Sequence, residues 1–324
     1  MDPIKPIQPL TTRPPEISVV EPVSPALERV KRVLFQPFSL GKWFVIGFGA
    51  WLAHLGESGG FHFSVPGGGG NNGGASFQHE FEHARDFVLS NLGWILPLVA
   101  LAAVAALALW LLTLWLNSRG KFVFLHCVAL DKAEVSQPWN QFARQGNSLF
   151  LFRLGLMLIA GMSALPLVTL IVLLIVRMAL RGEPEVGGIL VAAGLGLILV
   201  GLGIVFGIIQ KLTTDFVVPI MFLRRSRCME AWRELGTLLS VNVGRFILYL
   251  LFTIVLGMAI GLILITFLLV TCCVCCLALL PYVGTVIVLP VLMFKRAYSL
   301  YFLAQFGPKY DVFATAPPGQ LKPT

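Results

Sequence analysis

A histidine and glutamate motif has the residue types and the spacing of a zinc-dependent hydrolase. His79, Glu80 and His83 match the pattern H-E-x-x-H. Residues four apart share one face of a helix, so the two imidazoles can hold zinc while the glutamate activates water. His79 and His83 are therefore candidate metal ligands. No third ligand follows at a familiar spacing, and the neighbouring glycine tract would preorganise a catalytic site poorly, so a solvated polar loop is the competing interpretation.

Four cysteines form a second cluster whose residue type suits metal binding or redox chemistry. Cys272, Cys273, Cys275 and Cys276 flank a single valine. Adjacent cysteines on a regular helix cannot all face one ion, and no polar residue nearby would stabilise their thiolates. Cysteine also behaves as a small apolar residue, which favours a tight helical hairpin as the interpretation. A disulfide in an oxidising compartment is the alternative.

The elements that must position these residues are long apolar helices. Of 324 residues, 57% are hydrophobic and only 12% are charged, with a mean hydropathy of +0.84. A soluble domain has about 25% charged residues, so lipid must cover much of this chain. Six apolar stretches stand out, at residues 39–55, 93–116, 154–176, 187–209, 246–270 and 277–294. We expect an all-α fold, a polytopic helical membrane bundle with about six transmembrane helices.

The distribution of basic residues predicts how these helices are oriented. Of the 24 lysines and arginines, 21 lie in four segments, at residues 1–42, 117–153, 210–245 and 295–324. Segments rich in lysine and arginine stay in the cytoplasm, so both termini are expected there, in a bacterial inner membrane that the chain crosses several times. The net charge of +8 thus reflects membrane topology, and no nucleic acid partner is expected.

Composition divides the chain into a membrane domain and two tails. Residues 1–25 are rich in proline and are expected to form a disordered cytoplasmic tail, and residues 314–324 a disordered C-terminal tail. The helical membrane domain covers residues 26–313 and includes a flexible, glycine-rich outer loop at residues 56–78. Residues 26–35 place apolar and charged positions on opposite helical faces, which predicts an amphipathic interfacial helix on the anionic membrane surface.

Two of the expected cytoplasmic connections resemble each other. One places Phe122 17 residues before Trp139, and the other places Phe216 16 residues before Trp232. Each leaves one apolar helix, crosses an amphipathic stretch and enters the next apolar helix. We interpret this as an internal duplication, an arrangement found in membrane bundles that include transporters.

Charged residues beside the predicted spans favour interfacial roles. Arg153, Lys211 and Asp215 lie close enough to the inner interface for their side chains to reach water, so we expect them to snorkel. No carboxylate lies near the middle of a predicted span, which argues against ion-coupled transport. The basic run at residues 224–227 is expected to contact anionic head groups.

Glycine pairs within the spans predict close helix packing. Gly203 with Gly207, and Gly257 with Gly261, have the G-x-x-x-G spacing. Glycines at this spacing let two helix backbones approach closely, which favours packing inside the bundle over a dimer interface or a pore.

Motifs in the second half of the chain carry a family resemblance. They are TDFVVPIM (214–221), EAW (230–232), PYVGT (281–285), LPV (289–291), RAYSL (296–300) and QFGP (305–308). With them the chain resembles a group of uncharacterised bacterial multi-pass membrane proteins. More distantly, the duplicated unit is similar to the membrane domain attached to some glycerophosphodiester phosphodiesterases. The resemblance implies a helical membrane fold and, without the catalytic domain of those enzymes, neither hydrolase activity nor site residues.

These observations favour a non-enzymatic inner-membrane protein that organises lipid or partner proteins through its basic interfacial segments. Its expected partners are membrane lipids, through anionic head groups at the cytoplasmic face, and the sequence identifies no protein partner, cofactor or catalytic residue. A permease or lipid-handling transporter is the alternative, and a membrane metallopeptidase that uses His79 and His83 is a more distant one. A water-accessible polar cavity would favour the transporter, whereas a closed apolar interior would exclude it.

Overall fold

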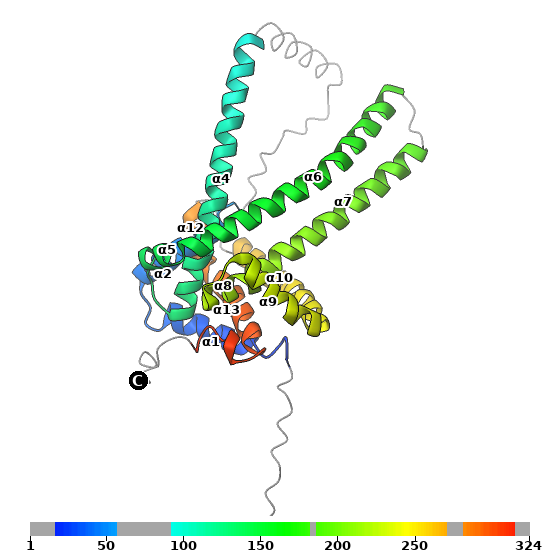
Figure 1. Cartoon of the computed structure of the whole chain (residues 1–324). Helices are drawn as coiled ribbons and strands as arrows, with labels where there is room; N and C mark the ends of the chain where they lie inside the picture. Colours follow the sequence, from blue (N-terminus) through cyan, green and yellow to red (C-terminus); the bar gives the residue numbers. More distant parts are fainter. Residues whose placement is uncertain (1–16, 57–91, 182–185, 271–280, 315–324) are drawn as a thin grey trace, which may run out of the picture.

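The computed structural model describes residues 17–56, 92–181, 186–270 and 281–314, and within these ranges the chain forms helices and no strand. In Figure 1, α4, α6 and α7 project from a packed base that contains α1, α2, α8, α9 and α13. The elements in chain order are α1 (Val23–Phe35), α2 (Leu40–His54), α4 (Leu92–Leu130), α5 (Ser136–Gln141), α6 (Ala143–Arg181), α7 (Val186–Leu212), the π-helix η1 (Thr213–Val217), α8 (Val218–Arg224), α9 (Cys228–Val241), α10 (Val243–Val270), α12 (Pro281–Ile287), α13 (Leu289–Ala304) and the 3-10 turn η2 (Pro308–Tyr310).

Four of the described helical stretches are long and apolar enough to cross a membrane. They are Gly93–Leu130, Ala143–Met178, Val186–Arg224 and Val243–Thr266, each with a hydropathy of 2.6 or more in its most apolar part. Almost none of that apolar part is buried against protein. Lipid is the medium that can cover such helices, because in water their exposed leucines and valines would be unfavourable. This confirms the predicted helical fold of a membrane protein.

The first and last predicted spans differ from these four. α2 has 15 residues, about 22 Å at 1.5 Å per residue, which is shorter than a hydrocarbon core of about 30 Å. It packs along α4 and α12. Residues 271–280 lie outside the described ranges, and the rest of the last predicted span is divided between α12 and α13. The count of six spans therefore stays a prediction.

The base is built where the long helices continue beyond their apolar halves. α4 has 39 residues, about 58 Å, which is nearly twice the thickness of the hydrocarbon core. Its second half packs against α2, and Phe122, Leu125 and Val128 are fully or almost fully buried there. Residues 117–130, expected to belong to a connection, thus extend the helix into a protein core.

The predicted amphipathic helix at residues 26–35 is present as α1, but its apolar face contacts protein. Val30, Val33 and Leu34 are buried, and α1 packs against α13. The guanidinium of Arg29 donates to the carbonyl oxygens of Val128, at 3.0 Å, and Ala129, at 2.7 Å. These bonds satisfy carbonyls in the last turn of α4, which has no further helical turn to accept them. α1 therefore closes the base instead of resting its apolar face on lipid.

Residues 17–22, placed by composition in a tail, lie against α13. The backbone N–H and carbonyl of Ser18 form reciprocal hydrogen bonds with the side chain of Gln305, at 2.7 and 2.9 Å. The hydroxyl of Tyr298 donates to the carbonyl of Val19 at 2.8 Å. These contacts join the N-terminal and C-terminal parts of the described chain.

The two connections compared in the sequence follow the same course in space. Asp131 follows the last residue of α4 and has φ 57°, and Arg225 follows the last residue of α8 and has φ 55°, both left-handed conformations that stop a helix. Each lies nine residues beyond a buried phenylalanine, Phe122 or Phe216. A separate helix then follows in each case, α5 or α9, before the next apolar helix begins. An internal duplication would produce this shared geometry.

Gly120 tests the contact between α2 and α4. A Cβ at Gly120 would lie 2.5 Å from the backbone carbonyl carbon of Leu52, which cannot move without shifting α2. We expect Gly120→Ala to lower the free energy of unfolding by about 2 kcal/mol through overpacking. Thermal unfolding in detergent measures the change.

Gly236→Ala on α9 is the matched control. No atom lies within 4 Å of its ideal Cβ, and alanine favours a helix by up to about 1 kcal/mol over glycine. Its unfolding temperature should stay the same or rise. Equal unfolding temperatures for the two variants would contradict the close approach of α2 and α4.

Candidate functional site: a basic cavity at the base of the long helices

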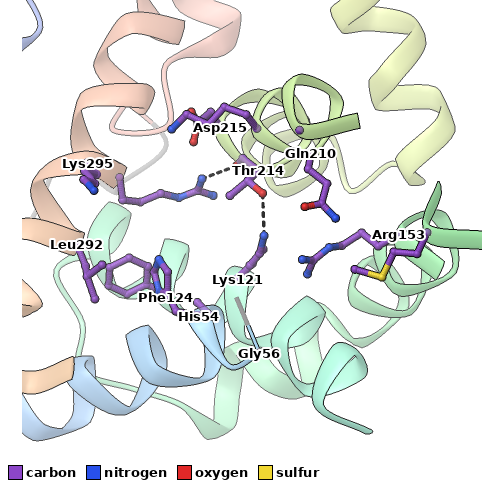
Figure 2. Close-up of a pocket in the computed structure, with 15 residues that line it drawn as sticks. His54, Gly56, Lys121, Phe124, Arg153, Gln210, Thr214, Asp215, Leu292 and Lys295 are labelled. Atoms are coloured by element: carbon purple, nitrogen blue, oxygen red, sulfur yellow. Dashed lines mark hydrogen bonds and ion pairs between the residues drawn. The ribbon is translucent and has the colours of Figure 1, made fainter. Parts of the chain in front are cut away.

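A cavity of about 600 Å³ lies where the long helices enter the packed base. Figure 2 shows side chains from several elements converging on it. Its walls come from α4, α6, α7, η1 and α13 and from the end of α2. The lining residues are Ala53, His54, Gly56, Lys121, Phe124, Arg153, Met157, Gly207, Gln210, Lys211, Thr214, Asp215, Leu292, Lys295 and Arg296.

Asn117 on α4 fixes one wall of the cavity. Its side-chain nitrogen donates to the carbonyls of Ala53, at 2.9 Å, and Leu55, at 2.8 Å, which belong to the last turn of α2. Its side-chain oxygen accepts a hydrogen bond from the Arg153 guanidinium on α6. Arg153 is only 5% exposed, so this bond holds a charged group inside the protein. The Asn117 side chain is itself buried, and it ties α2, α4 and α6 together.

The π-helix η1 presents two polar groups of Thr214 to the opposite wall. The Lys121 ammonium donates to the Thr214 hydroxyl at 2.7 Å, and Arg296 donates to the Thr214 carbonyl at 2.6 Å. Figure 2 shows Lys121 approaching Thr214 from the side opposite η1. A π-turn widens a helix and frees carbonyl groups from the regular pattern, and such turns are frequent at functional sites. Here the π-turn gives α4 and α13 a shared hydrogen-bonding partner, Thr214.

Among the described residues that line the cavity, Asp215 is the one with a carboxylate. It accepts from the Lys211 ammonium at 2.8 Å and from the Tyr249 hydroxyl at 3.0 Å. Asp215 is 7% exposed, while the Lys211 side chain is 40% exposed. The Asp215 carboxylate thus links the end of α7 to α10 through these two contacts.

Most of the charged side chains on the described part of the cavity wall are cations. They are Lys121, Arg153, Lys211, Lys295 and Arg296, beside the carboxylate of Asp215. Ammonium and guanidinium groups donate strong hydrogen bonds to carboxylates and phosphates. The described wall therefore contains donors of the kind that an anion-binding site needs.

Two groups at the C-terminal side of the cavity have displaced pKa values. Partial removal from water and the nearby Lys211 ammonium lower the pKa of Lys295, and Asp215 opposes this shift. Burial raises the pKa of Tyr298, and the Asp215 carboxylate raises it further. Tyr298 therefore stays neutral over the whole physiological range, where it acts as a hydrogen-bond donor.

The metal candidates from the sequence are not part of this cavity. His79 and His83, and the cysteine cluster at residues 272–276, lie outside the described ranges. Within those ranges, no group of three histidine, cysteine, aspartate or glutamate side chains is placed to hold a metal ion. The hypothesis of metal binding at His79 and His83 thus stays a prediction.

The structure corrects the interpretation of two of the three interfacial charges. Arg153 and Asp215 do not snorkel to water, because both are buried, and with Lys211 they line one cavity. Lys121, Lys295 and Arg296 were not predicted from the sequence as site residues. One available signal was that Lys121 precedes Phe122 just as Asp215 precedes Phe216 in the two similar connections.

The glycine pairs do not form close helix contacts within the described residues. No atom lies within 4 Å of an ideal Cβ at Gly203, Gly207, Gly257 or Gly261. Gly207 instead lines the cavity. The close approach occurs at Gly120, which lies against the backbone of α2 and is not part of any G-x-x-x-G pair.

Together, the described residues define a helical fold in which four helices are able to span a membrane and a basic cavity lies at their base. The chain belongs to a family of unknown function, DUF7544, whose model matches residues 17–280. No curated protein and no solved structure matches the chain. The family description names neither an activity nor a glycerophosphodiester phosphodiesterase, so the distant resemblance to the membrane domain of those enzymes stays a prediction.

Asp215→Asn tests whether the buried carboxylate balances the cations of the wall. The substitution keeps the side-chain shape and removes the negative charge, so we expect a loss of about 1–3 kcal/mol in the free energy of unfolding. Glu234→Gln is the control, because it removes the charge from a more exposed pair with Arg224 at 2.8 Å. That change should cost less than about 1 kcal/mol. Thermal unfolding in detergent compares the two, and equal losses would contradict a special role for Asp215.

Proposed function

We propose that this protein is a non-enzymatic, multi-pass membrane protein that binds anionic lipid head groups in its basic cavity. The observation that carries the proposal is a cavity at the base of helices that lipid must cover, whose described walls bring five cationic side chains from four helices together. In a bilayer, the head group of a lipid lies where the hydrocarbon core meets water, and the base of the long helices would lie at the same level. The cations therefore meet an anionic head group without taking the acyl chains out of the hydrocarbon core.

The proposed topology follows the distribution of charge along the chain. Six spans with both termini in the cytoplasm would place the base at the inner face of a bacterial inner membrane. The lysines and arginines of the base favour this orientation, since such residues stay on the cytoplasmic side. Anionic lipids of the inner leaflet would then lie beside the cavity. The shared geometry of the α4–α5 and α8–α9 connections supports an internal duplication within this bundle.

A lipid-handling transporter is the second candidate, and the cavity is the observation that favours it. The cavity is lined by charged groups and reaches Met157 and Gly207 on the two helices of the α6–α7 hairpin. A lipid that enters beside this hairpin could be passed on to the other leaflet. Proteoliposomes separate the candidates: a transporter moves fluorescent anionic lipid between leaflets, whereas a protein that only binds lipid leaves its distribution unchanged.

Lys295→Gln is the substitution that tests lipid binding with the least risk to folding. Lys295 is an exposed residue on the cavity wall, so its loss should leave the base folded. Removing one cation should weaken binding of anionic lipid about five- to thirty-fold, which corresponds to about 1–2 kcal/mol. Native mass spectrometry of protein released from nanodiscs, with and without anionic lipid, measures the bound fraction.

Lys309→Gln is the matched control for charge. Lys309 is also exposed and also lies near the C-terminus, but it contacts the ring of Tyr310 outside the cavity. The Lys309→Gln variant should retain anionic lipid as well as the unmodified protein does. Equal losses in both variants would mean that net charge, and not the cavity, attracts the lipid. Retention in both would count against the proposed site.

A further inference from the structure

A second, smaller cavity lies where the turn between α8 and α9 meets the start of α6. Its volume is about 100 Å³, and its lining residues are Arg144, Gln145, Arg225, Ser226, Arg227 and Glu230. Pockets for drug-sized ligands hold about 300 Å³ or more, so a cavity of this size suits a small ion. The described linings of this second cavity and of the basic cavity share no residue.

The position of the second cavity along the helices favours a ligand from water over a lipid. Arg144 lies nine residues before Arg153 on α6, which is about 13 Å at 1.5 Å per residue. Arg225 lies ten residues beyond Asp215. Because Arg153 and Asp215 line the basic cavity, the second cavity is farther from the lipid-exposed parts of α6 and α7 than the basic cavity is.

Contacts on both sides of the turn hold Arg225 in place. The guanidinium carbon of Arg225 lies 4.1 Å from the centre of the Phe142 ring, and the guanidinium donates to the carbonyl of Gln141 at 3.3 Å. The backbone carbonyl of Arg225 accepts from the side-chain nitrogen of Gln145 at 3.1 Å, which joins the turn to α6. A guanidinium that is already oriented loses less conformational entropy when it binds an oxyanion.

The start of α9 adds donors beside these arginines. The N-cap residue of α9 is Arg227, which has no acceptor atom and forms no side-chain cap hydrogen bond. The N–H of Cys228 donates to the Ser148 hydroxyl at 3.0 Å, and the N–H of Arg227 donates to Glu230 at 3.2 Å. The next N–H groups of the first turn can donate to an anion, as helix N-termini commonly do. Guanidinium groups bind the oxygens of a phosphate in the same way.

Two buried oxygens in the lining distinguish between oxyanions. Oε1 of Gln145 and Oγ of Ser226 have no hydrogen-bond partner among the described residues, and Gln145 is only 7% exposed. Because its nitrogen donates to the Arg225 carbonyl, the Gln145 oxygen is an acceptor that lacks a donor. At neutral pH inorganic phosphate has a P–OH donor beside its acceptor oxygens, whereas sulfate has acceptors alone. Phosphate can therefore donate to Gln145 and accept from the Ser226 hydroxyl.

We propose that the second cavity binds inorganic phosphate from the surrounding water and prefers it to sulfate. The guanidiniums of Arg144, Arg225 and Arg227 donate to its oxygens, and Gln145 accepts from its P–OH group. This inference goes beyond the lipid-binding function and does not depend on it, because different described residues line the two cavities.

The test is a calorimetric titration of the full chain in detergent free of phospholipid. Phosphate and sulfate are titrated separately at equal ionic strength near pH 7.5. We expect saturable phosphate binding with a Kd below about 1 mM, and sulfate binding weaker by about tenfold or more. Equal affinity for the two ions overturns the proposal, and so does the lack of saturable phosphate binding.

Arg144→Gln tests whether the phosphate lies in this cavity. Arg144 is exposed, so its loss should leave the fold intact, which thermal unfolding checks. The loss of its charged hydrogen bonds should weaken phosphate binding about five- to tenfold. Arg233→Gln is the matched control, because Arg233 is also exposed and lies on α9 outside both described linings. It should bind phosphate as the unmodified chain does, and equal losses in the two variants would contradict the site.

Lys295→Gln and lipid retention separate this inference from the proposed function. Lys295→Gln should leave phosphate affinity unchanged, since Lys295 lines the basic cavity, and a loss there without one in Arg144→Gln would overturn the second site. In nanodiscs that contain phosphatidylglycerol, Arg144→Gln should retain as much of this lipid as the unmodified chain. Loss of the lipid in that variant would mean that the arginines contact head groups, which overturns the inference. Unchanged lipid retention in Lys295→Gln would count against the proposed function alone.

Discussion

The side-chain amide of Asn117 donates to the carbonyls of Ala53 and Leu55 at the end of α2 and accepts from Arg153 on α6. Each of these groups would be costly to bury alone: carbonyls without a further helical turn and a guanidinium away from water. Asn117 satisfies them together. Asn117 lies on the half of α4 that packs against protein, so its hydrogen bonds hold the end of α2 and the side chain of Arg153 beside α4. The cavity lies between these groups and η1, and it depends on their spacing.

The sequence predicted where the long helices of this protein lie better than it predicted what their side chains contact. Long apolar runs have one stable form in lipid, which is why the four long helices could be predicted from composition alone. The role of Arg153 could not be predicted, because a side chain at the start of an apolar run can either snorkel to water or be buried against protein. Only the partner, Asn117, decides between them, and it lies 36 residues away in the chain. Likewise, the apolar face of α1 suits lipid and protein equally well, and α13, which covers it, is over 250 residues away.

Three helix ends in the base share one geometry. In each, a fully or almost fully buried aromatic residue is followed nine residues later by a residue with positive φ. The three pairs are Phe122 with Asp131, Phe216 with Arg225, and Tyr298 with Gly307. The first two belong to the connections whose sequences resemble each other, and the third lies beyond α13, where sequence alone did not indicate it. The common spacing places the residues just before each aromatic at the same depth in the base.

Four of the six residues that directly precede these aromatics line the cavity. They are Lys121, Thr214, Asp215 and Arg296, whereas Gly120 and Ala297 do not line it. Lys121 and Arg296 both donate to Thr214, at 2.7 and 2.6 Å, so the three ends converge on η1. Two residues before the aromatic, Gly120 in one helix end corresponds to Arg296 in another. One residue before the aromatic, Ala297 corresponds to Lys121. Packing of the helix ends therefore does not require the cations. Because these cations gather at the base of a lipid-exposed bundle, we propose that they serve binding of an anionic lipid.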